Sequence, residues 1–259
     1  MSDNFGNLPE HLTATVELSV SGQNLRLEMS VPTGPTRPAR MLPLFRSLAE
    51  TLVGLAVENA RAEGLEVSCR KGCGACCRQM VPVSKFEARR LRELVNEMPE
   101  PRRSEVVSRF EAARCRMREA GLMEKLLEPE RIAEEEYRAF GLAYFHQGVA
   151  CPFLEDESCS IHSERPLVCR EYLVVSPAEN CERRGAGPVK VLRVPASVST
   201  AVRCFDGEGS RQREGWVPLI LALEWADAHP DEPLERPGTE LLGELFRNLT
   251  GQGIPPPPT

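Results

Sequence analysis

The stretch CRKGCGACCR at residues 69–78 decides how this sequence is read, because it holds four cysteines. Within it, Cys73 and Cys76 have the C-x-x-C spacing at which a tight turn directs two sulfurs toward one metal ion. Gly74 lies between them and gives the backbone the freedom that such a turn needs. Cys77 follows directly, and adjacent side chains point in different directions in a helix or a strand. We therefore expect either different roles for the two adjacent thiols or a site larger than a single structural zinc.

A second group of cysteines lies between residues 151 and 181. Cys159 and His162 have the C-x-x-H spacing of a metal-binding pair, in which the histidine is either a ligand or a hydrogen-bond partner beside the ligands. The last two cysteines of the group come from separate turns, as ligands do where a metal joins distant segments. The predicted metal ligands are the eight grouped cysteines Cys69, Cys73, Cys76, Cys77, Cys151, Cys159, Cys169 and Cys181.

Eight thiols exceed the needs of one tetrahedral site. They suffice for two four-thiolate sites, or for one cluster with spare redox thiols. The expected cofactor is zinc or iron, either as ions or as an iron–sulfur cluster such as a 4Fe–4S cluster. Metal binding requires thiolates, and nearby cations favour the charged form of a thiol. The cations close to the cysteines in sequence are Arg70, Lys71, Arg78, Arg165 and Arg170.

The order of these motifs resembles the YkgJ-type cysteine-cluster family, which is described as a zinc- or iron-chelating domain. The matching elements are CGACCR at residues 73–78, CPFL at 151–154 and CSIHSERPLVCR at 159–170. They lie within a span of about residues 65–182. The first element of the family is C-x-x-C-x-x-C-C, whereas three residues separate Cys69 from Cys73 here. Because the family includes proteins related to flagellin lysine N-methylase, the resemblance implies protein lysine methylation as one activity.

The composition indicates an ordinary acidic globular protein. Its 259 residues carry 32 Lys and Arg against 38 Asp and Glu, a net charge of −6, which argues against a generally basic binder of nucleic acid or membrane surfaces. We find no apolar run long enough to cross a bilayer, and the first residues lack the pattern of a secretion signal. We therefore expect a cytoplasmic protein, in which clustered cysteines are metal ligands or redox groups before they are disulfides.

The remaining two cysteines have simpler interpretations. Cys115 lies on a predicted helix over residues 102–120, opposite its apolar stripe, which indicates an exposed thiol. Cys204 is expected to be a small core residue.

The periodicity along the chain predicts a predominantly helical α+β fold. A β-hairpin is expected over residues 13–31, and helices over 44–61, 84–98, 102–120, 130–146, 216–228 and 241–249. The predicted domains are residues 1–40, a hairpin with a proline-rich linker; residues 41–230, the cysteine-cluster metal-binding domain; and residues 231–259, a helix with a disordered proline tail. The cysteines lie in irregular loops, which we expect to surround the metal centre.

Three functions remain open at this stage. The first is a metal-binding protein, with zinc, iron or an iron–sulfur cluster, of unknown specific activity. The second is an enzyme, either a lysine N-methylase-like protein or a redox enzyme, acting on a protein substrate. The third is an interaction module that a metal stabilises and whose hairpin offers a strand edge to a protein partner. No nucleic-acid or membrane partner is expected.

Overall fold

A computed structural model provides the structure, and it describes residues 10–20, 23–183, 187–205, 216–230 and 235–250. Two features noted in the sequence fall at least partly outside these residues. They are the predicted hairpin, at its residues 21–22, and the proline tail at residues 255–258.

The described chain is predominantly helical and contains short antiparallel strand pairs, so the predicted α+β class is confirmed. The α-helices are α1 (Leu42–Ala62), α2 (Lys85–Glu97), α3 (Arg102–Glu119), α4 (Met123–Leu127), α5 (Glu134–Phe145), α6 (Leu167–Glu171), α7 (Glu179–Glu182), α8 (Val198–Arg203), α9 (Ala222–Ala228) and α10 (Gly238–Thr250). The 3-10 helices are η1 (Pro38–Met41), η2 (Ala75–Arg78), η3 (Pro129–Arg131), η4 (His162–Glu164) and η5 (Leu219–Leu221). The strands are β1 (His11–Val20), β2 (Gln23–Pro32), β3 (Pro35–Thr36), β4 (Pro82–Ser84), β5 (Leu154–Glu155), β6 (Ser158–Cys159), β7 (Trp216–Pro218) and β8 (Arg236–Pro237).

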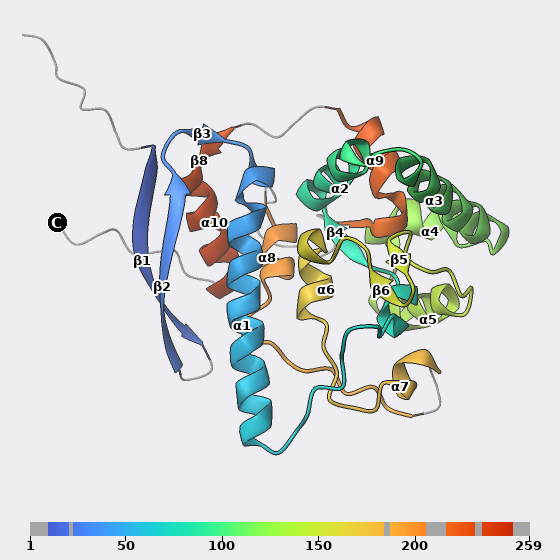
Figure 1. Ribbon diagram of the computed structural model, residues 1–259, viewed down its shortest axis with the longest axis horizontal. Coiled ribbons are helices and arrows are strands. Elements are labelled where there is room, and N and C mark those ends of the chain that lie inside the picture. Colours follow the sequence, from blue (N-terminus) through green and yellow to red (C-terminus); the bar gives the residue numbers. More distant parts are fainter. Residues whose placement is uncertain (1–9, 21–22, 184–186, 206–215, 231–234, 251–259) are drawn as a thin grey trace, which may run out of the picture.

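The β1–β2 hairpin lies at one end of the molecule, beside α10 and α1 (Figure 1). Its strands are antiparallel, with Val16 opposite Leu27 and Leu18 opposite Leu25. The alternate apolar residues of both strands therefore share one face, as their period of two predicts. That face packs on the buried stripe of α1, which includes Phe45. This cluster, which also takes in residues of α8 and α10, is the hairpin-side core.

A second core lies at the other end of the molecule, among α2, α3, α4, α5 and α9 (Figure 1). Strands β4 and β7 cross it as an antiparallel pair in which Val83 lies opposite Val217. The predicted helix over residues 216–228 is wrong at its start, because β7 takes the first three residues and α9 begins only at Ala222. At these residues, pairing with β4 is more favourable than the helix that the apolar run predicts. Similarly, the predicted helix over 130–146 begins at Glu134, after the 3-10 helix η3.

Helix α6 lies between the α8 side of the molecule and the β5–β6 pair, and α7 lies at the lower right of the view (Figure 1). The predicted domain limits at residues 40 and 230 remain a prediction, although the hairpin shares its core with α1 and α10. Within the described part of the chain, no helix combines the length and the apolar character that crossing a membrane requires.

Candidate metal centre

The first cysteine segment is an irregular loop that leads into η2. Gly72 takes a left-handed conformation, with φ at 82°, and Cys73 N donates to Arg70 O at 3.1 Å to close the turn. Farther along, Val174 N donates to Cys69 Sγ at 3.4 Å. The loop is thus connected at its start to the strand-like segment that follows α6.

Two connections hold this loop against the second cysteine segment. Cys151 N donates to Cys77 O at 2.7 Å, and Arg78 forms a two-point ion pair with Glu157, with Nη2 2.6 Å from Oε1 and Nη1 3.0 Å from Oε2. Gly74 lies so close to the second segment that a Cβ atom there would collide with the Glu157 carboxylate and approach Leu154 Cδ1 to 2.8 Å. This glycine is therefore needed for the close approach of the two segments rather than for an unusual φ.

The second segment presents its cysteines from a small hairpin and a short helix. Strands β5 and β6 pair Leu154 with Cys159. The residues between these strands, Asp156 and Glu157, both have positive φ, at 48° and 55°. After η4, helix α6 carries Cys169.

A buried carboxylate on α2 accepts a hydrogen bond from the start of helix α6. Glu87 forms a capping box with Ser84 at the start of α2, and its other carboxylate oxygen accepts a hydrogen bond from Leu167 N at 2.7 Å. The α2 cap thus also positions the start of the helix that bears Cys169.

The arrangement brings most of the predicted ligands to one place. A cavity of about 690 Å³ lies between the two segments, and its wall includes His162, Arg165 and Tyr172. Seven of the eight predicted cysteines line it: Cys69, Cys73, Cys76, Cys77, Cys151, Cys159 and Cys169.

The eighth predicted ligand is not part of the cavity wall. Cys181, on α7, is only 4% exposed and packs in a small cluster with Ala75 and Val174. Cys69 and Cys73 pack against the same cluster, so Cys181 lies behind the first cysteine segment. All ten cysteines belong to the described residues, and none of them is in a disulfide.

As the side chains stand, no three Cys, His, Asp or Glu residues in the described ranges converge at metal-ligand separations. The fit of a metal therefore depends on the chemistry of the donors, which are thiols and one imidazole around a common cavity. Soft thiolates bind zinc and iron–sulfur clusters, so this donor set fits both. Occupation would require the thiols to rotate toward a common point.

Burial favours the protonated form of two cavity thiols. It raises the pKa of Cys151 to about 12 and that of Cys169 well above its ordinary value, and neighbouring thiolates raise both further. The pKa of Cys76 is raised by its hydrogen bond with Cys77 and by burial. Metal binding here must therefore displace protons.

Arg165 is the cation that acts most widely on these thiols. Its charge lowers the pKa of Cys69, Cys76 and Cys159, against the larger opposing effect of burial or hydrogen bonding. It is also the main cause of the lowered pKa of His162, which favours the neutral form of this exposed imidazole, the form that can bind a metal.

The other cations named from the sequence divide into two kinds. Arg70 and Lys71 line the cavity together with Arg165. Arg78 is paired with Glu157, whereas Arg170 binds Glu50 and the carbonyls of Ser163 and Arg165. Arg165 differs from both of these paired residues, because its buried Nε donates no hydrogen bond within the described chain.

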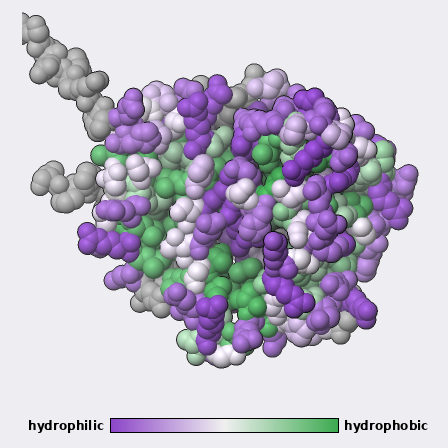
Figure 2. All heavy atoms as spheres, in the orientation of Figure 1, coloured by the Kyte–Doolittle hydropathy of each residue, from purple (hydrophilic) through white to green (hydrophobic). Residues whose placement is uncertain are grey.

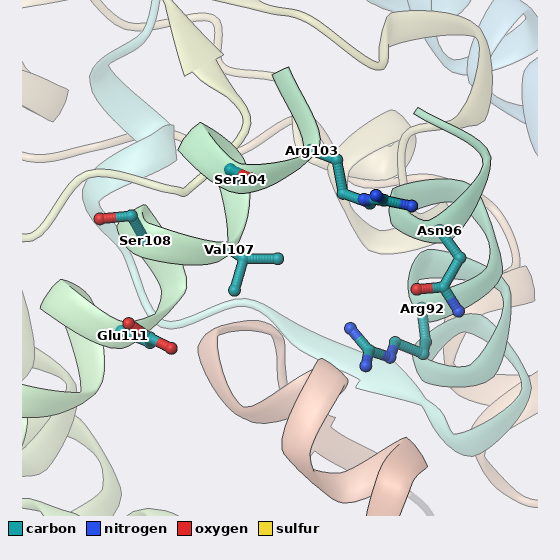
Figure 3. Close-up of a pocket in the computed structure, with 7 residues that line it drawn as sticks. All are labelled: Arg92, Asn96, Arg103, Ser104, Val107, Ser108 and Glu111. Carbon is teal, nitrogen blue, oxygen red and sulfur yellow. The ribbon is translucent and has the colours of Figure 1, made fainter. Parts of the chain in front are cut away.

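A second hollow differs from the cysteine-lined cavity in the residues of its wall. It has a volume of about 410 Å³ and lies between α2 and α3 (Figure 3). The two arginines in its wall, Arg92 and Arg103, form ion pairs with Asp227 and Glu100. Its wall contains no cysteine: it comprises Arg92, Asn96, Arg103, Ser104, Val107, Ser108 and Glu111.

Neither of the two isolated cysteines lines the cavity. Cys115 is exposed on α3, as predicted, whereas Cys204 is half-buried at the end of α8 rather than fully in the core. The sequence did not indicate the Glu157 clamp or the contact of Glu87 with α6, because both join residues that are about 80 positions apart.

Comparison with known proteins agrees with this geometry. Residues 68–186 match a family model named CxxCxxCC, whose description is "Putative zinc- or iron-chelating domain". No curated protein and no solved structure matches the chain. The matched segment begins one residue before Cys69 and ends after Cys181, so it contains every predicted ligand. Over residues 68–186 this chain therefore matches the CxxCxxCC family, as the order of its cysteine motifs predicts.

Proposed function

We propose that the chain binds iron or zinc through cysteine thiolates in the central cavity, with the eight grouped cysteines as the ligand supply. The observation that carries the proposal is the gathering of seven thiols, from two segments far apart in sequence, around one cavity of about 690 Å³. The family description supports the same metals.

The packing of the thiols supports a division into two groups. Cys151 and Cys159 pack against the second core, whereas Cys69, Cys73 and Cys181 belong to the small cluster behind the first segment. A thiolate at Cys76 would raise the pKa of Cys151, Cys159 and Cys169, the three cavity thiols of the second segment, so its charge acts on all three.

We therefore propose that Cys76 completes an inner four-thiolate site with Cys151, Cys159 and Cys169. The outer thiols then form a second site or serve as spare redox groups. These are Cys69, Cys73, Cys77 and Cys181.

An iron–sulfur cluster is the first candidate and zinc the second. Four thiolates suit both, but a single tetrahedral zinc ion fills little space, whereas a cluster would use more of the cavity. Arg165, with its buried Nε, supplies positive charge beside a centre that four thiolates make negative.

Purification without oxygen, followed by metal and acid-labile sulfide analysis and a visible absorption spectrum, tests the proposal. Iron with sulfide and a brown colour would select the cluster, and stoichiometric zinc in a colourless protein would select the ion. A folded protein that holds neither metal would contradict the proposal.

The more specific functions are further proposals, with less support than metal binding. Lysine methylation or a redox reaction on a protein substrate rests on the family resemblance alone, and calorimetry with S-adenosylmethionine tests the first. A role as a metal-stabilised interaction module, and the absence of a nucleic-acid partner, likewise await direct tests. Ten cysteines in thiol form fit a reducing compartment, which supports a cytoplasmic location.

A further inference from the structure

Strand β1 offers a long open edge. It runs over His11–Val20, and within the described part of the chain it forms a ladder with β2 alone. Figure 1 shows β1 as the outermost element on its side of the molecule. Its sequence, HLTATVELSV, contains no lysine and no proline, which are the residues that commonly protect a strand edge from pairing.

The hydrogen-bond pattern of the hairpin shows which residues present this edge. Thr33 N donates to Glu10 O at 3.0 Å, directly beyond the end of the ladder and in the same register. Because hydrogen-bonded and non-hydrogen-bonded pairs alternate in an antiparallel ladder, even-numbered residues of β1 face β2 with their N–H and C=O groups. The odd-numbered residues, including Thr13, Thr15 and Glu17, therefore direct theirs to the open edge.

We propose that two copies of this chain associate through their β1 strands, antiparallel about a two-fold axis at Thr15. Thr15 would pair with its own copy, and Thr13 with Glu17 of the second copy. A continuous four-stranded sheet would result. The proposal is independent of the metal function.

The residue pattern of β1 favours this register. On the inner face it places Leu12 opposite Leu18 of the second copy, and Leu12 is 45% exposed while Leu18 is buried. It also places the two Glu17 side chains four residues apart along the strands, about 13 Å. An axis at Glu17 would place these like charges face to face, which destabilises a strand pair. An axis at Val16 would bring them to a diagonal position about 7–8 Å apart.

One edge of this length forms a small interface, so the dimer should be concentration-dependent rather than permanent. Sedimentation velocity on the full chain from about 1 µM to about 1 mM, at fixed metal content, measures the association. We expect the wild type to shift from the monomer mass toward twice that mass. A monomer throughout this range would overturn the proposal.

Two variants break the edge and a third is the matched control. Thr15→Pro removes an N–H group that faces away from β2, so the hairpin remains intact while the association weakens by more than about tenfold. Thr15→Lys places two lysines face to face at the axis and should weaken the dimer by about fivefold. Thr13→Lys adds the same charge to another exposed position, but opposite Glu17, and should maintain or strengthen the dimer.

Circular dichroism and thermal unfolding establish that each variant is folded. A dimer that Thr15→Pro leaves unchanged would place the interface elsewhere and overturn the proposal. Equal effects of the two lysine variants would overturn the register, and with it the axis at Thr15.

Discussion

The hairpin-side core and the cysteine cavity are stabilised in different ways. The core buries large side chains such as Phe45, Leu52 and Leu245. Figure 2 also shows hydrophobic residues at the surface over the hairpin, on the left of the view. The cavity lies among short helices and irregular loops, and its two segments are joined to each other by the Arg78–Glu157 ion pair, the backbone hydrogen bond from Cys151 to Cys77 and a close glycine contact. The comparison indicates that one region folds by apolar burial, whereas the other needs a ligand to become rigid.

The largest expected effect comes from truncating the core. Phe45 is fully buried and contacts Phe205 edge to face, with ring centroids 5.7 Å apart. Phe45→Ala should lower the free energy of unfolding by about 3–5 kcal/mol while the metal content of the folded protein stays unchanged. Denaturant unfolding and metal analysis of the same sample check both halves of this prediction. If the metal were lost in a folded variant, metal binding in the cavity would depend on the hairpin-side core, and the two regions would not be stabilised independently.

An added methyl group tests the close approach of the two cysteine segments. Gly74→Ala forces a carbon into Leu154 and Glu157, so it should cost about 1–3 kcal/mol and reduce metal occupancy. Gly54→Ala is the matched control, because Gly54 lies within α1 with open space around it. That change should stabilise the protein by about 0.5–1 kcal/mol. Similar losses from both variants would argue against the contact.

The pH dependence of the metal-free protein tests the burial of the cavity thiols. The pKa of Cys151 is about 12 in the fold against 9.0 ordinarily, so an unfolded chain ionises first as the pH rises. The stability that this thiol contributes is therefore fully present below about pH 9 and decreases between the two values, by about 1 kcal/mol at pH 10. Thermal unfolding with a chelator and a reductant from pH 7 to pH 10 measures the loss, which Cys151→Ala should reduce.

The smallest expected change in stability comes from the clamp between the segments. Arg78→Met removes a partly exposed ion pair with Glu157 and should cost less than about 1 kcal/mol, yet a chelator should remove the metal faster. Arg92→Met removes a comparable ion pair with Asp227, beside the second hollow between α2 and α3. This change should leave the rate of metal removal by the chelator unchanged. Equal rates in both variants would show that the clamp does not hold the cavity closed.

Local features of this molecule could be predicted from the sequence, whereas long-range contacts could not. The capping box of Ser84 and Glu87 and the alternating hairpin depend on neighbouring residues, so their patterns are sufficient. The β4–β7 pair joins segments that are distant in sequence, and an apolar run at residues 216–218 fits a helix or a strand equally well.

In the candidate site too, local features could be predicted from the sequence and long-range contacts could not. The C-x-x-C and C-x-x-H spacings indicated thiols that do line the cavity. Spacing alone could not reveal that Cys181 lies behind the wall, or that Glu157 holds Arg78 while Arg165 faces the thiols. Those facts depend on how the loops pack, which leaves no periodic signal in the sequence.

The most direct test of the central claim is the metal content of two serine variants purified without oxygen. Cys169→Ser removes a half-buried cavity thiol on α6, and Cys115→Ser removes an exposed thiol on α3 that does not line the cavity. We predict that the first loses most of the bound iron or zinc while the second retains the wild-type amount, with both proteins folded by circular dichroism. Full metal content in Cys169→Ser, or equal loss in both variants, would contradict a metal centre in this cavity.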